Sequence, residues 1–109
     1  MTEQTKRPWG WYAVIEKTKI IEIKPLHRLS LQYHNYRKES WEILSGYGKV
    51  TINKKTFEAK KGDKFSILEK QVHRIEAGEE GLFLIENATG TNVDEEDIIR
   101  LKDDYGRIK

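Results

Sequence analysis

The 109-residue sequence contains no cysteine and no long apolar segment. Without cysteine the chain can form neither a disulfide nor a thiolate nucleophile, so any metal site must use nitrogen and oxygen ligands. No stretch approaches the roughly 20 apolar residues of a membrane span, and the polar segment 1–7 lacks the apolar run of a secretion signal. We therefore expect a cytoplasmic protein that does not associate with membranes.

The sequence also lacks a large excess of either charge, because 20 basic and 18 acidic residues leave a formal net charge of only +2. A balance this small does not indicate a nucleic-acid partner. Hydrophobic residues make up 37% of the chain, which is enough for one compact core. Two folding units of half this length would each bury too little surface, so residues 1–109 are expected to form a single domain.

Short runs rich in β-branched and aromatic residues dominate what is present. They cover residues 11–16, 20–24, 29–34, 41–45, 49–53, 56–59, 64–68, 73–77 and 82–87. Runs repeating about every eight to twelve residues are typical of a sandwich or barrel. Turn-forming residues separate them, including the glycine-containing segments 45–48 and 78–81, which we read as hairpin connections between antiparallel strands.

Only residues 94–101 have a helical pattern. The acidic start suits a helix N-terminus, and Ile98, Ile99 and Leu101 could cover one face. The sequence thus predicts an all-β fold with one short C-terminal helical turn.

Polar and apolar residues alternate between residues 28 and 34, and an extended strand places alternate residues on opposite faces. The polar face carries Arg28, Ser30, Gln32 and His34, and the apolar face carries Leu29, Leu31 and Tyr33. A carboxylate, Glu39, and a distant imidazole, His73, follow. The spacing Gln32-x-His34-x4-Glu39-x6-Gly46 is similar to the first cupin motif, and Gly62 and His73 fit the second.

Two imidazoles, a carboxylate and an amide oxygen form a site suited to one divalent ion, Zn²⁺, Mn²⁺, Fe²⁺, Co²⁺ or Ni²⁺. Any one of these residues, taken alone, could be an ordinary residue of an exposed strand or a turn with no metal bound. Their fixed offsets across two hairpins favour a metal site made by Gln32, His34, Glu39 and His73. The remaining histidine, His27, has the opposite parity and is interpreted as a surface residue.

Three longer segments carry a more specific resemblance: residues 7–12 (RPWGWY), residues 28–34 together with Arg37, Glu39 and Trp41, and residues 96–107. With them the chain resembles the cupin domain of the type II mannose-6-phosphate isomerase family, which often follows a mannose-1-phosphate guanylyltransferase domain in fusion proteins. The resemblance implies a single cupin β-barrel (jelly roll), the same four metal ligands, and a sugar-phosphate pocket inside the barrel. It also implies a role in carbohydrate metabolism and polysaccharide biosynthesis.

The chain departs from the family pattern beside this pocket. Asn35 and Tyr36 stand where the family usually has histidines, and Leu68 and Lys70 replace the proline and glycine commonly found before His73.

The leading functional hypothesis is therefore interconversion of mannose 6-phosphate and fructose 6-phosphate, or of a similar aldose–ketose pair. The metal would polarise the oxygens at C1 and C2 while a base moves a proton between these carbons. Arg28 is the preferred phosphate ligand, and Arg37 and Arg74 are weaker candidates. Both are equally compatible with a surface charge, which is the favoured interpretation of Arg74. The base is not assigned; a metal-bound hydroxide is one option, and the candidate side chains are Tyr36, Glu42 and Glu86.

Two alternatives stay open: a non-catalytic module that binds a sugar or sugar nucleotide, favoured by the departures near His34 and His73, and a metal-dependent dioxygenase. No glycine-rich nucleotide loop is present, so nucleotidyl transfer is not expected. We also expect a homodimer, because Trp9, Trp11 and Tyr12 are apolar anchors near exposed strand edges. These aromatics could instead close one end of the monomer's own barrel.

Overall fold

The computed structural model describes residues 3–16, 18–90 and 97–107. All regular structure in these ranges is β-strand, so none of them contains a helix that could cross a membrane. The strands are β1 (Thr5–Arg7), β2 (Gly10–Ile15), β3 (Thr18–Ile23), β4 (Leu31–Tyr33), β5 (Arg37–Ile52), β6 (Lys55–Lys60), β7 (Lys64–Ile67), β8 (His73–Gly90) and β9 (Ile99–Lys102).

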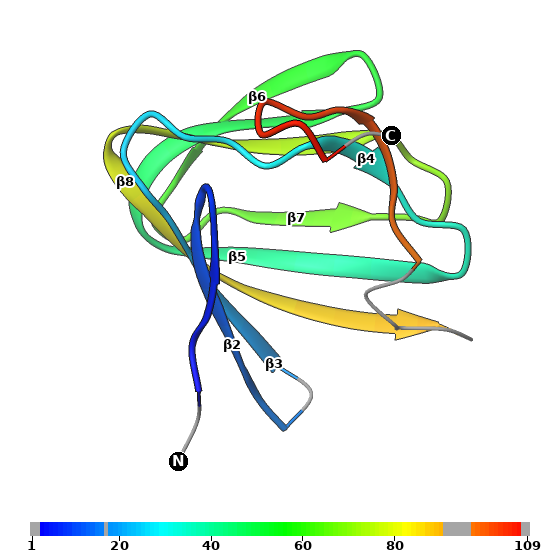
Figure 1. Cartoon of the computed structure of the whole chain (residues 1–109), viewed down its shortest axis with the longest axis horizontal. Coiled ribbons are helices and arrows are strands. Elements are labelled where there is room, and N and C mark those ends of the chain that lie inside the picture. Colours follow the sequence, from blue (N-terminus) through cyan, green and yellow to red (C-terminus); the bar gives the residue numbers. More distant parts are fainter. Residues whose placement is uncertain (1–2, 17, 91–96, 108–109) are drawn as a thin grey trace.

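The strands form one sheet in which every pairing is antiparallel. Its neighbours run β1-β2-β3-β8-β4-β9, and β5 pairs with β6, β7 and β8. The sheet curls over on itself, and β5 and β8 each run through both of its layers (Figure 1). The predicted all-β cupin barrel is confirmed.

Glycines permit the bends in these two long strands. Gly46 has a φ of 81°, and a side chain there would meet the carbonyl oxygen of Gly81 on the paired strand; Gly48 approaches Glu76 as closely. The β5–β8 register shifts next to both glycines. Segments 45–48 and 78–81 were predicted to be hairpin turns, and this was wrong: they are bends inside β5 and β8, because both sides of each bend stay paired to the same neighbour.

The inner face of the barrel is apolar at one end and polar at the other. Alternate residues of β5 point inward, beginning with Arg37, Glu39, Trp41 and Ile43, while Lys38 points outward. The apolar end contains Trp9, Ile21, Ile23, Trp41, Ile43, Val50, Ala59, Ile67, Ile75, Ala77, Leu82 and Leu84. The core therefore supports a polar chamber on the same strands.

The predicted C-terminal helical turn is not present, although residues 94–96 of that prediction lie outside the described residues. Asp97 and Ile98 have no regular structure, and the next four residues form β9, which pairs with β4. Asp97 does not cap a helix. Its carboxylate accepts hydrogen bonds from the backbone N–H groups of Asn35 (3.0 Å) and Tyr36 (2.9 Å), so a tertiary contact prevails over the local helical pattern.

Candidate metal centre

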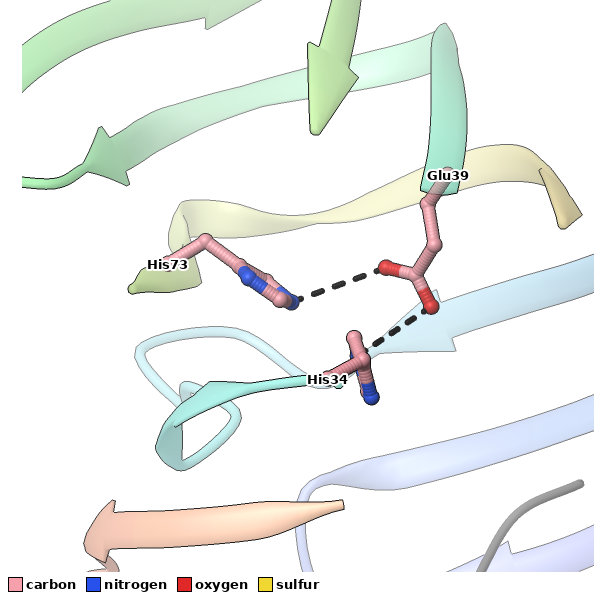
Figure 2. A group of neighbouring side chains, drawn as sticks. All are labelled: His34, Glu39 and His73. Carbon is pink, nitrogen blue, oxygen red and sulfur yellow. Dashed lines mark ion pairs between the residues drawn. The ribbon is translucent and has the colours of Figure 1, made fainter. Parts of the chain in front are cut away.

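Two histidines and one glutamate converge inside the barrel from three separate parts of the chain. His34 directly follows β4, Glu39 lies near the start of β5, and His73 begins β8. Glu39 Oε2 lies 3.3 Å from Nε2 of His34, and its Oε1 lies 3.5 Å from Nε2 of His73. All three side chains are buried and point toward one another (Figure 2).

Hydrogen bonds to backbone carbonyls fix the state of both imidazoles. Nδ1 of His34 contacts the carbonyl oxygen of Asp97 at 2.5 Å, and Nδ1 of His73 contacts that of Gln71 at 2.9 Å. A carbonyl only accepts, so each Nδ1 carries the proton and each Nε2 presents a lone pair. This is how protein histidines are commonly oriented toward a metal.

The arrangement of these atoms fits a divalent cation. Two lone pairs and a carboxylate face one another, and Nε2 of His73 has no hydrogen-bond partner in the described part of the chain. Two atoms that each lie about 2.1 Å from one ion are about 3.0 Å apart at a right angle and about 3.4 Å apart at the tetrahedral angle. The observed separations of 3.3 and 3.5 Å are close to the latter value.

Gln32 lies next to this group. In the sheet it is the direct neighbour of His73 on β8 and of Arg100 on β9, so its side chain shares the inner face with both. Its side chain is 9% exposed. The structure therefore brings all four sequence-predicted metal residues to one region of the barrel interior.

Arg37 supplies a buried positive charge at the same place. Its Nη2 lies 2.9 Å from Glu39 Oε2 and 3.3 Å from Nε2 of His34. A cation beside Glu39 is expected if this carboxyl group is ionised, because an uncompensated buried charge is costly.

Burial controls the protonation of the three groups. Burial, followed by the charge of Arg37, lowers the pKa of His34 to about 4. Burial also lowers the pKa of His73. Burial, followed by the nearby Glu86 carboxylate, raises the pKa of Glu39 to about 8. Both imidazoles are thus neutral at neutral pH, whereas Glu39 holds its proton there and would release it on binding a cation.

The centre opens into a small pocket with a cavity volume of about 60 Å³. Its lining is rich in cationic side chains, which come from β1, β3, β5, β9 and the C-terminal segment. They are Arg7, Lys19, Arg37, Arg100 and Arg107. Among residues 3–16, 18–90 and 97–107, the acidic residues of the lining are Glu39 and Glu86. A pocket with this balance suits an anionic ligand.

Not every sequence-predicted residue reaches this pocket. Arg28 binds Asp104 through both carboxylate oxygens, at 2.7 and 3.0 Å, and does not line it. Arg74 donates to the carbonyl of Leu29 instead. Among the candidate bases, Tyr36 is 55% exposed and Glu42 lies on the outer face of β5.

Glu86 alone of these candidates lines the pocket. It accepts a hydrogen bond from the indole N–H of Trp41 at 3.1 Å and lies 3.5 Å from the ammonium of Lys19.

Sequence reasoning missed the role of Asp97 and the four outer cations of the pocket. Asp97 anchors His34 through its carbonyl and the two following residues through its carboxylate. Nothing in its local pattern distinguishes it from its acidic neighbours. Arg7 and Arg107 do lie in the segments that carried the family resemblance, which was the available signal for them.

Several known proteins are similar to the chain in sequence. Alginate biosynthesis protein AlgA of Pseudomonas aeruginosa is 40% identical over 107 residues, covering 93% of this chain and 22% of that protein. Mannose-1-phosphate guanylyltransferase ManC of Salmonella typhimurium is 34% identical over 114 residues, covering 99% of this chain and 24% of its own length. The chain thus spans about a quarter of the length of the curated relatives it matches.

Solved structures share the fold at low sequence identity. The capsular polysaccharide assembling protein CapF from Staphylococcus aureus superimposes with a TM-score of 0.79 at 16% identity, over 94% of this chain and 34% of CapF. Oxalate decarboxylase from Bacillus subtilis gives a TM-score of 0.77 at 18% identity, over 92% of this chain and 30% of that protein. Residues 1–103 match the family described as "Mannose-6-phosphate isomerase C-terminal". The chain belongs to this family of cupin domains.

Proposed function

We propose that the chain binds one divalent metal ion through His34, Glu39 and His73, with the amide oxygen of Gln32 as a fourth ligand. With this ion bound, we propose that the chain interconverts mannose 6-phosphate and fructose 6-phosphate or a similar aldose–ketose pair. The observation that carries the proposal is the buried His34–Glu39–His73 group, of which His34 and Glu39 line a pocket rich in cations. Membership of the isomerase family supports the same substrate class.

The metal, when bound, would stabilise negative charge that develops on the oxygens at C1 and C2 of the sugar. His34 and His73 would hold their Nε2 atoms in place through the carbonyl contacts of their Nδ1–H groups. Trp41 and the apolar end of the barrel would limit the access of water.

Glu86 is the side chain we propose as the base that moves the proton between C1 and C2. It lies in the pocket beside Glu39, and the Trp41 indole and Lys19 ammonium hold its two oxygens. Because Glu39 would be committed to the metal, Glu86 is the carboxylate that remains available among the described residues of the lining.

A second candidate is a metal-containing module that binds a sugar or sugar nucleotide without turnover. The observation that favours it is the set of departures from the family pattern at Asn35, Tyr36 and Lys70, all close to His34. Tyr36 is largely exposed, so it does not replace a histidine inside the pocket.

The test is an isomerase assay on metal-free protein reloaded separately with Mn²⁺, Zn²⁺, Fe²⁺, Co²⁺ and Ni²⁺. The proposal expects mannose 6-phosphate to be converted to fructose 6-phosphate with at least one ion. His73→Ala should be inactive, and His27→Ala should keep full activity because His27 is not part of the His34–Glu39–His73 group. Metal-loaded protein that binds mannose 6-phosphate but never converts it would instead identify the binding module. Oxygen consumption would indicate a dioxygenase.

A further inference from the structure

We propose that Arg7, Arg100 and Arg107 form a subsite for the phosphate group of the ligand, with Lys19 as a fourth positive charge. The inference deepens the proposed function and rests on it for the class of ligand, a phosphate monoester of a small sugar. It assigns the phosphate to residues from β1, β9 and the C-terminal segment.

Exposure divides the pocket lining into an inner and an outer part. His34, Glu39 and Arg37 are buried, whereas Arg7 is exposed and Arg107 is partly exposed. The outer cations therefore mark the mouth, and the metal residues mark the inner end. A sugar phosphate with its carbonyl end at the metal would leave its phosphate toward this mouth.

The guanidinium of Arg107 is held in a defined orientation. Its Nε and Nη2 donate to the two carboxylate oxygens of Asp103 at 2.9 and 2.8 Å, and the Arg107 backbone N–H donates to the same carboxylate at 2.7 Å. This uses two of the five N–H donors of the guanidinium. An orientation fixed before binding lowers the entropy lost when a ligand is bound.

The segment that carries Arg107 is itself anchored. Arg28 forms its two-point contact with Asp104, and the rings of His27 and Tyr105 stack with centroids 6.3 Å apart. These contacts hold residues 103–107 against the barrel. Arg28 thus anchors this segment and does not line the pocket. Its place on the polar face of residues 28–34 had suggested a phosphate contact, but its side chain is used in the pair with Asp104.

Arg7 and Lys19 are brought together by one aromatic ring. The Cζ atom of Arg7 lies 5.3 Å, and Nζ of Lys19 lies 4.6 Å, from the centroid of the Tyr12 ring. Both residues and Tyr12 line the pocket. Stacking on an aromatic face holds Arg7 near the mouth without neutralising its charge, whereas Lys19 is also paired with Glu86 at 3.5 Å.

Arg100 connects the two ends of the pocket. It is the direct sheet neighbour of Gln32, which in turn neighbours His73, so the three side chains follow one row across the inner face. A ligand that contacts Arg100 is therefore close to the metal residues as well.

The chemistry of this group favours phosphate over a neutral sugar. Guanidinium groups bind phosphate oxygens through paired, charge-assisted hydrogen bonds. Among the described residues, the lining offers five cations and two carboxylates, Glu39 and Glu86, which are buried rather than at the mouth and lie beside Arg37 and Lys19. An uncharged sugar would gain nothing from the surplus charge.

The experiment is calorimetric titration of the metal-loaded protein with mannose 6-phosphate, mannose and inorganic phosphate. Arg107→Gln, Arg100→Gln and Arg7→Gln are each expected to weaken mannose 6-phosphate binding about tenfold or more, the loss typical of one charged contact. Lys38→Gln is the matched control, because Lys38 is exposed on the outer face of β5. Mannose binding and metal content should be unchanged in all four variants.

Arg7 is exposed, so Arg7→Gln should not disturb the fold. This variant therefore tests the subsite even if Arg107→Gln disturbs the C-terminal segment. Unchanged mannose 6-phosphate affinity in Arg7→Gln and Arg100→Gln, or no phosphate-dependent binding by the unaltered protein, would overturn the subsite. If these variants isomerise mannose 6-phosphate with an unaltered KM, the phosphate subsite is rejected and the proposed isomerase function is supported. Phosphate-dependent binding that these variants lose, without turnover, would support the subsite and reject the isomerase.

Discussion

The indole N–H of Trp41 donates to Oε1 of Glu86 at 3.1 Å, which holds the Glu86 carboxylate at the wall of the pocket beside the candidate metal centre. The two residues are direct neighbours on β5 and β8, and Lys19 on β3 contacts the other oxygen. A carboxylate oriented on both sides, beside the proposed metal ligand Glu39, is well placed for proton transfer.

Replacing this carboxylate tests its role as the base. Glu86→Gln keeps the shape of the side chain, so metal content should be unchanged, while kcat falls about 100-fold or more, as is typical for loss of a general base. Steady-state kinetics with mannose 6-phosphate measures the change. Glu42→Gln is the control, since Glu42 lies on the outer face of β5. Equal activity of the two variants would remove Glu86 from the mechanism.

The backbone at Lys70 predicts a stabilising substitution. Lys70 has a φ of 64°, and its N–H donates to the carbonyl of His34 at 2.7 Å. A left-handed conformation costs a residue with a side chain about 1–2 kcal/mol, partly offset by the greater freedom of glycine in the unfolded chain. Lys70→Gly should therefore raise the free energy of unfolding by up to about 1 kcal/mol.

Chemical denaturation measures this change. Glu69→Gly is the matched control, because Glu69 does not have a positive φ. The control should be destabilised or unchanged. If Lys70→Gly is no more stable than Glu69→Gly, the positive φ of Lys70 does not lower the free energy of unfolding.

The Asp103–Arg107 pair predicts a pH-dependent stability. Hydrogen bonds from the Arg107 side chain, above all, lower the pKa of Asp103 to about 2. A carboxylate with a lowered pKa stabilises the fold fully above its ordinary pKa, near 4, and loses this contribution as pH falls toward 2. Asp103→Asn should lower Tm at pH 7, and the difference from the unaltered protein should shrink between pH 4 and pH 2.

Thermal unfolding followed by circular dichroism at a series of pH values gives the measurement. The exposed Glu79→Gln variant serves as the control and should show little difference at any pH. A Tm difference for Asp103→Asn that stays constant from pH 7 to pH 2 would contradict the account.

The homodimer stays a prediction, but two of the three aromatic residues that suggested it are used within the monomer. Trp9 is buried in the core and Tyr12 lines the pocket, so both are used within the monomer. Val14 and Ile15 on β2 are each 48% exposed and now carry the patch argument. Light scattering should give about twice the chain mass of 12.9 kDa, and Val14→Lys should lower it. A mass near 12.9 kDa at micromolar concentrations would rule the dimer out.

Local patterns predicted the features that depend on strand geometry. The alternation in residues 28–34 predicted an inward polar face, and Ser30, Gln32 and His34 are buried. The approximate positions of most strands followed from the same two-residue period.

Features that depend on distant partners could not be predicted in this way. Glycines in a turn-like sequence give no sign that both flanks pair with one long neighbour, so the bends of β5 and β8 were read as hairpins. Arg28 has the parity of a pocket residue, but its partner Asp104 follows from how the C-terminal segment packs. The same packing brings Arg107 to the pocket, where spacing alone could not place it.

Metal stoichiometry tests the central claim most directly. Metal-free protein is dialysed against Mn²⁺ or Zn²⁺, and bound metal is measured by elemental analysis for the unaltered chain, His34→Ala, His73→Ala and His27→Ala. We expect one ion per chain in the unaltered protein and in His27→Ala, and near-complete loss in the other two variants, with all four folded by circular dichroism. Equal metal content in all four proteins, or none in the unaltered chain at millimolar metal, would contradict the assignment of His34, Glu39 and His73 as a metal centre.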